Sequence, residues 1–191
     1  MPKIRLFGNI ILSFLNKISS GYWNIFDSNN GFTAIHADVA SLLPFEKISK
    51  DFFFESDILF RLNLLRAVVI DVPVKAIYAN EKSNLSVTKS VFIFSIKHLR
   101  NIFKRILYTY YFKDFSIASI MLPLGFLLLL FGVIYGGINW MQSSISGLPT
   151  IAGTIMLSAT SIIVGFQLLL NFLATDINSV PKKPFCNNKK S

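Results

Sequence analysis

Residues 115–175 read FSIASIMLPLGFLLLLFGVIYGGINWMQSSISGLPTIAGTIMLSATSIIVGFQLLLNFLAT and contain no Asp, Glu, Lys or Arg. A polar connection at residues 142–150 divides this stretch into two apolar spans, at about residues 117–141 and 151–174. Each span exceeds the roughly 20 residues that a helix needs to cross a hydrocarbon core. The sequence therefore predicts a transmembrane hairpin, with its turn on one side of the membrane and both chain ends on the other.

The distribution of charge orients this hairpin. The chain has 19 Lys and Arg residues against 10 Asp and Glu, a net charge of +9. Residues 82–113 carry basic but no acidic side chains, the tail at residues 176–191 is also basic, and the turn carries no charge. Because loops rich in Lys and Arg stay on the cytoplasmic side, we expect residues 1–114 and the tail to be cytoplasmic.

Composition narrows the class of protein further. Hydrophobic residues make up 52% of the chain and charged residues only 15%, whereas soluble globular chains have about 25% charged residues. The single cysteine, Cys186, excludes an intrachain disulfide, and the distant His36 and His98 form no ligand pair. We therefore expect a membrane protein with no metal site or cofactor of its own and no nucleic-acid partner.

Residues 88–114, directly before the first span, have the pattern of a basic amphipathic helix. Six apolar residues recur along one stripe: Phe92, Ile96, Leu99, Phe103, Ile106 and Tyr110. Three basic residues lie on the opposite stripe: Lys97, Arg100 and Lys104. Such a helix normally lies in the headgroup layer, where each cation attracts anionic lipid by roughly 1 kcal/mol. We expect an interfacial helix here, with a basic flank that only fixes topology as the alternative.

Residues 1–87 have a mixed pattern. Apolar residues at helical spacing predict an amphipathic helix that ends near Gly21, and two more helices are expected at residues 34–43 and 52–65. Residues 67–74 are rich in β-branched side chains, which is typical of a buried strand. This order predicts a small α+β region with one convincing strand.

Three segments of this region carry a resemblance to a known family. They are residues 20–35 (SGYWNIFDSNNGFTAI), 53–62 (FFESDILFRL) and 71–85 (DVPVKAIYANEKSNL). They resemble the C-terminal half of family 2 glycosyltransferases, in the membrane-anchored branch related to polyprenyl-phosphate and dolichyl-phosphate sugar synthases. The likeness extends over about residues 5–185. It implies that residues 1–87 are the α+β, acceptor-side remnant of a GT-A type α/β domain, followed by the juxtamembrane helix and the hairpin.

The resemblance also implies a reaction. The parent enzyme would transfer a hexose from a nucleotide sugar to a polyprenyl-phosphate lipid at the inner (plasma) membrane, for cell-surface polysaccharide. Its nucleotide-binding half, with an Asp-x-Asp motif that holds Mg²⁺ or Mn²⁺, has no counterpart in residues 1–114. We therefore expect the isolated chain to be inactive and to meet a nucleotide sugar only with the missing half. The alternative is a non-catalytic two-helix anchor or interaction module that docks onto another subunit.

Site residues follow from the same likeness. Asp57, with Glu55 beside it, matches the acidic position of the acceptor-side helix and is the candidate general base or acceptor-positioning group. The alternative is a pair of carboxylates favoured by the dipole at a helix N-terminus. The substrate-binding candidates are Asp27, Asn30, Gly31, Arg61, Lys75, Glu81, Lys82 and Ser83. For Asp27, Asn30 and Gly31 a simple Asx-type turn is the competing interpretation.

The first apolar span also contains a packing motif. Gly132 and Gly136 form a Gly-x-x-x-Gly pattern, which permits close approach of membrane helices. The close approach can occur within the hairpin or between protomers, and the second case predicts a homo-oligomer.

Overall fold

The computed structural model describes residues 3–26, 32–51, 53–73 and 87–183. The chain divides into two compact units, residues 1–109 with 179–191, and residues 110–178. We call the first the helical unit and the second the hairpin unit, and describe each by itself.

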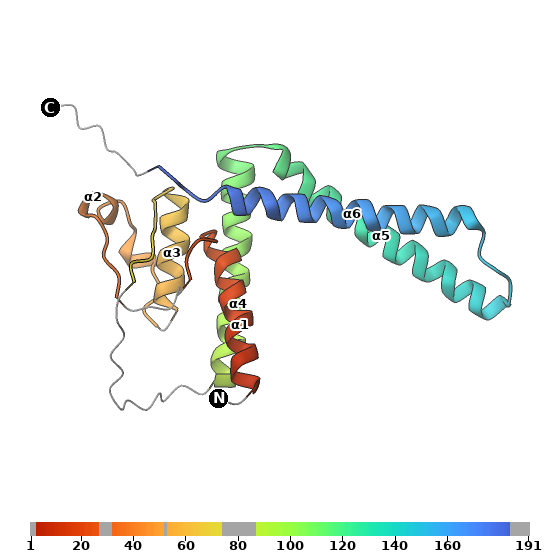
Figure 1. Cartoon of the computed structure of the whole chain (residues 1–191), viewed down its shortest axis with the longest axis horizontal. Helices are drawn as coiled ribbons and strands as arrows, with labels where there is room; N and C mark the ends of the chain where they lie inside the picture. Colours follow the sequence, from red (N-terminus) through yellow and green to blue (C-terminus); the bar gives the residue numbers. More distant parts are fainter. Residues whose placement is uncertain (1–2, 27–31, 52, 74–86, 184–191) are drawn as a thin grey trace. The chain divides into compact units, whose positions relative to one another are not determined.

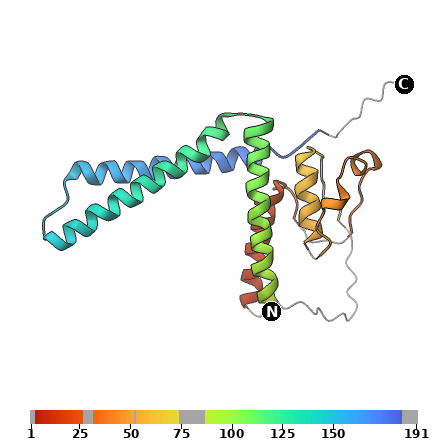
Figure 2. The same ribbon diagram turned by 180° about the vertical axis from the view of Figure 1, so that it is seen from behind.

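The helical unit contains four α-helices and a short 3₁₀ helix within its described residues. They are α1 (Lys3–Ser20), α2 (Ala37–Ala40), η1 (Phe45–Lys47), α3 (Phe54–Leu64) and α4 (Val87–Ile106). Helices α1 and α4 lie side by side, and α3 packs against both of them (Figures 1 and 2). A π-helical segment, η2 (Leu107–Lys113), follows α4.

The predicted α+β remnant of a GT-A type domain is wrong, because no strand occurs in the part of the chain that the structure describes. The backbone turns after α3 at Arg66, which has a φ of 59°. Residues 67–73 then run without helix or turn and join no sheet. The β-branched composition favours an extended backbone, but a strand also needs a neighbour to complete its hydrogen-bond ladder. Val74, the last residue of the expected strand, lies outside the described residues.

The apolar core of the helical unit is small and gathers around α3. Its buried members are Tyr22, Ile25, Leu43, Ile48, Ile58, Leu59, Leu62 and Ala67. The Tyr22 hydroxyl donates a hydrogen bond to the Ala67 carbonyl, and burial raises the pKa of this hydroxyl above its ordinary value. The contact ties the chain that follows α1 to the chain that follows α3.

The hairpin unit contains α5 (Ile117–Ser146) and α6 (Ala152–Asn178). Both helices are long and apolar enough to cross a membrane, as the sequence predicted, although α5 ends at Ser146 and α6 at Asn178, beyond the expected ends at about residues 141 and 174. Helix α5 ends at Gly147, whose φ of 68° lies in the left-handed region that glycine adopts without strain. Residues 142–146, which the sequence analysis assigned to the polar connection, therefore belong to the helix.

Small residues line the interface between α5 and α6. A Cβ atom on Gly165 would lie 2.7 Å from the Leu129 nitrogen, and one on Gly132 would lie 2.9 Å from the Ser158 carbonyl oxygen. The Ser158 hydroxyl donates to the Gly132 carbonyl at 2.8 Å. The Gly-x-x-x-Gly pattern thus packs within the hairpin, which was one of its two expected uses.

Candidate functional site

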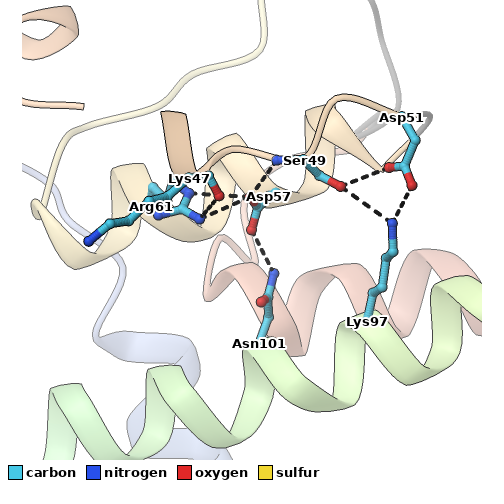
Figure 3. Close-up of polar contacts among 7 residues, drawn as sticks. All are labelled: Lys47, Ser49, Asp51, Asp57, Arg61, Lys97 and Asn101. Carbon is cyan, nitrogen blue, oxygen red and sulfur yellow. Dashed lines mark hydrogen bonds and ion pairs between the residues drawn. The ribbon is translucent and has the colours of Figure 1, made fainter. Parts of the chain in front are cut away.

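The Asp57 carboxylate accepts four hydrogen bonds from other parts of the helical unit. Asp57 lies in the first turn of α3 and is buried. One oxygen accepts from the Ser49 backbone N–H at 3.0 Å and from Arg61 Nε and Nη2, both at 3.2 Å. The other accepts from Asn101 Nδ2 on α4, also at 3.2 Å (Figure 3). We call Ser49, Asp57, Arg61 and Asn101 the Asp57 network.

The local sequence explains how these groups meet. Asp57 and Arg61 are four residues apart on α3, which places them on one face of the helix. Ser49 belongs to the turn before α3, where the Asp51 carboxylate accepts from the Phe53 N–H at 3.1 Å. An ionised carboxylate has about four acceptor positions, and four N–H groups point at this one. The Asp57 carboxylate is therefore held as a structural acceptor between α3 and α4.

A second charged pair adjoins the network. Lys97 on α4 forms an ion pair with Asp51 (Figure 3). The Lys97 ammonium also lies 5.5 Å from the centre of the Phe53 ring. The Ser49 hydroxyl donates to the other Asp51 oxygen at 2.8 Å. The hydrogen bond from Lys97 is the main reason that the pKa of Asp51 falls to about 2. Ser49 thus links both carboxylates through its backbone and its side chain.

The contact between α1 and α4 is also polar. His98 Nδ1 lies 2.7 Å from the Ser19 hydroxyl, and the His98 ring meets the Phe53 ring edge-on at 4.8 Å. Burial lowers the pKa of His98 to about 4, so the imidazole is neutral at pH 7. Further along α4, Arg105 Nε donates to the Ile18 carbonyl at 3.0 Å. The buried faces of both helices are thus rich in polar groups.

The Ser19–His98 pair has the hydrogen-bond distance of a nucleophile and its base. However, Ser19 is 0% exposed and His98 is 3% exposed. No substrate carbonyl can reach the Ser19 oxygen in this arrangement. The pair is therefore a structural contact that fixes α1 against α4.

The sequence-predicted site residues fall into two groups. Asp57 and Arg61 are joined directly, and Glu55 is half-buried in the same first turn of α3. The remaining candidates lie outside the described residues: Asp27, Asn30, Gly31, Lys75, Glu81, Lys82 and Ser83. The catalytic role of Asp57 stays a prediction, and its four donors favour positioning over proton transfer.

Sequence reasoning missed the polar inner face of α4. His98, Asn101 and Arg105 are buried, whereas Ile96, Leu99 and Phe103 of the expected apolar stripe are exposed. Of the other stripe members, Tyr110 is buried. The signal was present, because His98, Asn101 and Arg105 recur at spacings of three and four, which marks one helix face. It was overlooked because polar faces are usually solvated.

The protein thus combines a helical unit, which has a small apolar core and buried polar contacts between its helices, with a hairpin of two apolar helices of membrane-spanning length. No family model, curated protein or solved structure matches the chain.

Proposed function

We propose that the chain is a membrane-anchored protein whose α5–α6 hairpin crosses the inner (plasma) membrane. The observation that carries the proposal is the exposure of the two apolar helices. Only 22% of the most apolar window of α5 and 17% of that of α6 are buried, whereas a core helix of a soluble protein is mostly buried. Apolar surfaces of this kind are stable in contact with lipid. From the distribution of Lys and Arg, both chain ends are proposed to be cytoplasmic.

Helix α4 is proposed to lie in the headgroup layer. Four apolar side chains on its outer side and at the start of η2 are about half or more exposed: Ile96, Leu99, Phe103 and Leu107. We call them the outward stripe. Arg100 and Lys104 are exposed beside it, so apolar insertion and attraction to anionic lipid act on the same surface.

Lipid-depth measurements test this placement. We would replace Cys186 by Ser, introduce Phe103→Cys, attach an environment-sensitive fluorophore and reconstitute the full chain in nanodiscs. Nitroxides on the lipid headgroups should quench a label at position 103 and leave a label introduced by Asp38→Cys, on exposed α2, unquenched. Equal quenching at both positions would contradict the interfacial placement.

The finer proposal is that the chain is the acceptor-side, membrane-anchoring part of a hexosyltransferase that uses polyprenyl phosphate. In that reaction a phosphate oxygen of the lipid attacks the anomeric carbon of the nucleotide sugar, and the nucleoside diphosphate leaves. A lipid phosphate is already anionic near pH 7, so the step needs no general base. An Asp57 carboxylate that accepts from four donors is consistent with a reaction that needs no general base. Its role would be to hold α3 and Arg61 in place.

The nucleotide sugar and its Mg²⁺ or Mn²⁺ are proposed to belong to a companion polypeptide. The described residues bring together no three His, Cys, Asp or Glu side chains that could hold a metal ion. These described residues therefore do not fit the divalent ion that the family likeness implies.

A transfer assay tests the enzymatic proposal. Membranes containing the chain would be incubated with labelled nucleotide hexoses and polyprenyl phosphate, with and without a co-expressed polypeptide that carries an Asp-x-Asp motif. We expect labelled lipid only with both polypeptides present. Transfer by the chain alone would contradict the division of the site between two polypeptides.

The second candidate is a non-catalytic module that docks onto another membrane subunit. The Asp57 carboxylate favours it, because three donors share one of its oxygens and Asn101 holds the other, so the group already serves the packing of α3 against α4. For a module, the chain should form a stable membrane complex with no affinity for nucleotide sugars or polyprenyl phosphate. Measurable binding of either ligand to that complex would favour the enzyme.

A further inference from the structure

Helices α1 and α4 pack against each other and, as a pair, against α3. On α1, Asn16 Nδ2 donates to a side-chain hydroxyl of α3 at 3.0 Å, and Ser19 contacts α4. On α4, Asn101 contacts α3 and His98 contacts α1. Each helix of the pair therefore has one contact residue toward α3 and another toward its partner.

The exposed apolar residues of α1 lie on the side away from α3. Successive residues of an α-helix are turned by about 100° about its axis. Ile11 and Phe14 are therefore about 80° and 140° beyond Ser19, in the direction away from Asn16. Both side chains are exposed, Phe14 by 51%.

Helix α4 repeats this arrangement. Leu99 and Phe103 are about 100° and 140° beyond His98, in the direction away from Asn101. Both are exposed. Since α3 lies on the opposite side of both helices, their exposed apolar residues form one surface of the pair. We call this surface the shared apolar face, and its members are Ile11, Phe14, Leu99 and Phe103.

The charge of the two helices indicates what covers this face. Helix α1 has three Lys or Arg residues and α4 has five, and neither helix contains Asp or Glu. Arg100 and Lys104 are exposed on α4. A second copy of the chain would bring two equally basic surfaces together, which is unfavourable. An anionic lipid surface is complementary in both charge and hydrophobicity.

Two further observations favour lipid over an acidic protein. Helix α4 ends at Ile106 and α5, which is proposed to cross the membrane, begins at Ile117. So short a connection keeps lipid headgroups at a high effective concentration near α4. On α1, the Trp23 ring meets the Phe14 ring edge-on, with 6.1 Å between their centres. Trp is enriched at membrane–water interfaces, where its ring is partly apolar and its N–H can bond to water or headgroups.

We propose that α1 and α4 together bind the anionic surface of the membrane through the shared apolar face. The interfacial element is then a pair of helices and not α4 alone. Because α3 packs on the other side of the pair, the Asp57 network is held about 10 Å from the headgroups, the distance between packed helices. The inference rests on the proposed interfacial placement of α4 and adds the second helix, the charge of the lipid and the orientation of the helical unit.

Quenching of a label on α1 tests the pair. Phe14→Cys and Phe45→Cys would each be introduced into the full chain with Cys186→Ser, labelled with a fluorophore and reconstituted in nanodiscs that contain phosphatidylglycerol. Phe45, in η1, is the matched control, because it is 54% exposed but does not belong to the shared apolar face. Nitroxides on the headgroups should quench the label at position 14 about twofold or more relative to that at position 45.

A charge variant tests the requirement for anionic lipid. Arg100→Gln combined with Lys104→Gln should reduce the quenching at position 14 by about half in nanodiscs with phosphatidylglycerol, and should have little effect in nanodiscs of phosphatidylcholine alone. Lys47→Gln combined with Lys50→Gln removes two exposed lysines outside the α1–α4 pair and should preserve the quenching.

Equal quenching at positions 14 and 45 would overturn the proposal, as would quenching at position 14 that does not depend on anionic lipid. Self-quenching between the labels of two copies in one nanodisc would identify a second copy as the occupant and would also overturn it. A quenched label at position 103 with an unquenched label at position 14 would refute the helix pair alone. If neither label is quenched, the interfacial placement of α4 fails as well.

Discussion

The helices of the helical unit and those of the hairpin unit pack through different kinds of side chain. In the helical unit α1, α3 and α4 meet through buried polar side chains, among them Asp57, His98 and Asn101. In the hairpin unit α5 and α6 approach through glycine and serine, as at Gly165 and Ser158. Directional hydrogen bonds select one arrangement of the helices in the helical unit, whereas small residues let the apolar helices of the hairpin approach closely along their length.

The largest loss of unfolding free energy is expected when Asp57, the shared acceptor of the Asp57 network, is replaced. Asp57→Ala removes the acceptor of four N–H groups and leaves the largely buried Arg61 without its carboxylate. We expect the free energy of unfolding of the helical unit to fall by about 3 kcal/mol. Denaturant titration in detergent would measure it through Trp23 fluorescence, in a Trp140→Phe background.

The control is Asp51→Ala, which removes a more exposed carboxylate. We expect this substitution to cost less than about 1 kcal/mol. Equal losses at the two positions would show that burial of the Asp57 network does not distinguish it from a surface pair.

Acid should weaken the helical unit through His98. The pKa of His98 is about 4 in the folded state, against an ordinary value of 6.5. Between these values the unfolded state binds the extra proton, so stability falls as the pH falls from 6.5 to 4. The cumulative loss is on the order of 3 kcal/mol. Unfolding titrations at pH 7 and pH 4.5 would measure it.

His98→Gln should flatten this pH dependence, and His36→Gln, at an exposed position, should leave it unchanged. A persistent slope in the His98→Gln variant would assign the acid sensitivity to another group.

The stability of the hairpin unit should be sensitive to side-chain volume added at the interface between α5 and α6. Gly165→Ala places a Cβ within 2.9 Å of the Gly125 carbonyl oxygen and should destabilise the hairpin by about 2 kcal/mol. Gly153→Ala is the matched control, because nothing lies within 4 Å of its Cβ position. Unfolding in SDS, followed by Trp140 fluorescence in a Trp23→Phe background, would compare the two variants. Similar stabilities would contradict close packing at Gly165.

The smallest effect on the free energy of unfolding is expected at the partly exposed Lys97–Asp51 pair of the helical unit. Lys97→Ala removes the ion pair with Asp51, whose carboxylate is about half exposed. We expect a loss of about 0.5 kcal/mol that shrinks as salt is added. A loss of unfolding free energy as large as that of Asp57→Ala would contradict the prediction that the buried Asp57 network stabilises the unit more than the exposed Lys97–Asp51 pair.

The sequence predicted the hairpin well because the signal is local. A long stretch without charge admits few folds, and its helix starts agree with the structure. The helix ends were set too early, since Gln142 and Ser143 are polar but compatible with a helix. Only the backbone of Gly147 marks where α5 ends.

The helical unit was less predictable because its decisive contacts are distant in sequence. The Asp57–Arg61 pair could be anticipated from its spacing, but Asn101 lies 44 residues from Asp57. The strand expected after α3 was wrong because residue preference indicates extended backbone and says nothing of a neighbouring strand.

The central claim is that the hairpin crosses a membrane with the turn on one side and both chain ends on the other. A membrane-impermeant maleimide applied to intact and permeabilised cells tests it most directly, because Cys186 is the only cysteine. A cysteine introduced by Leu148→Cys, in the turn after α5, in a Cys186→Ser background should react in intact cells, whereas Cys186 in the native chain should react only after permeabilisation. Labelling of both positions in intact cells, or of neither until permeabilisation, would contradict the account.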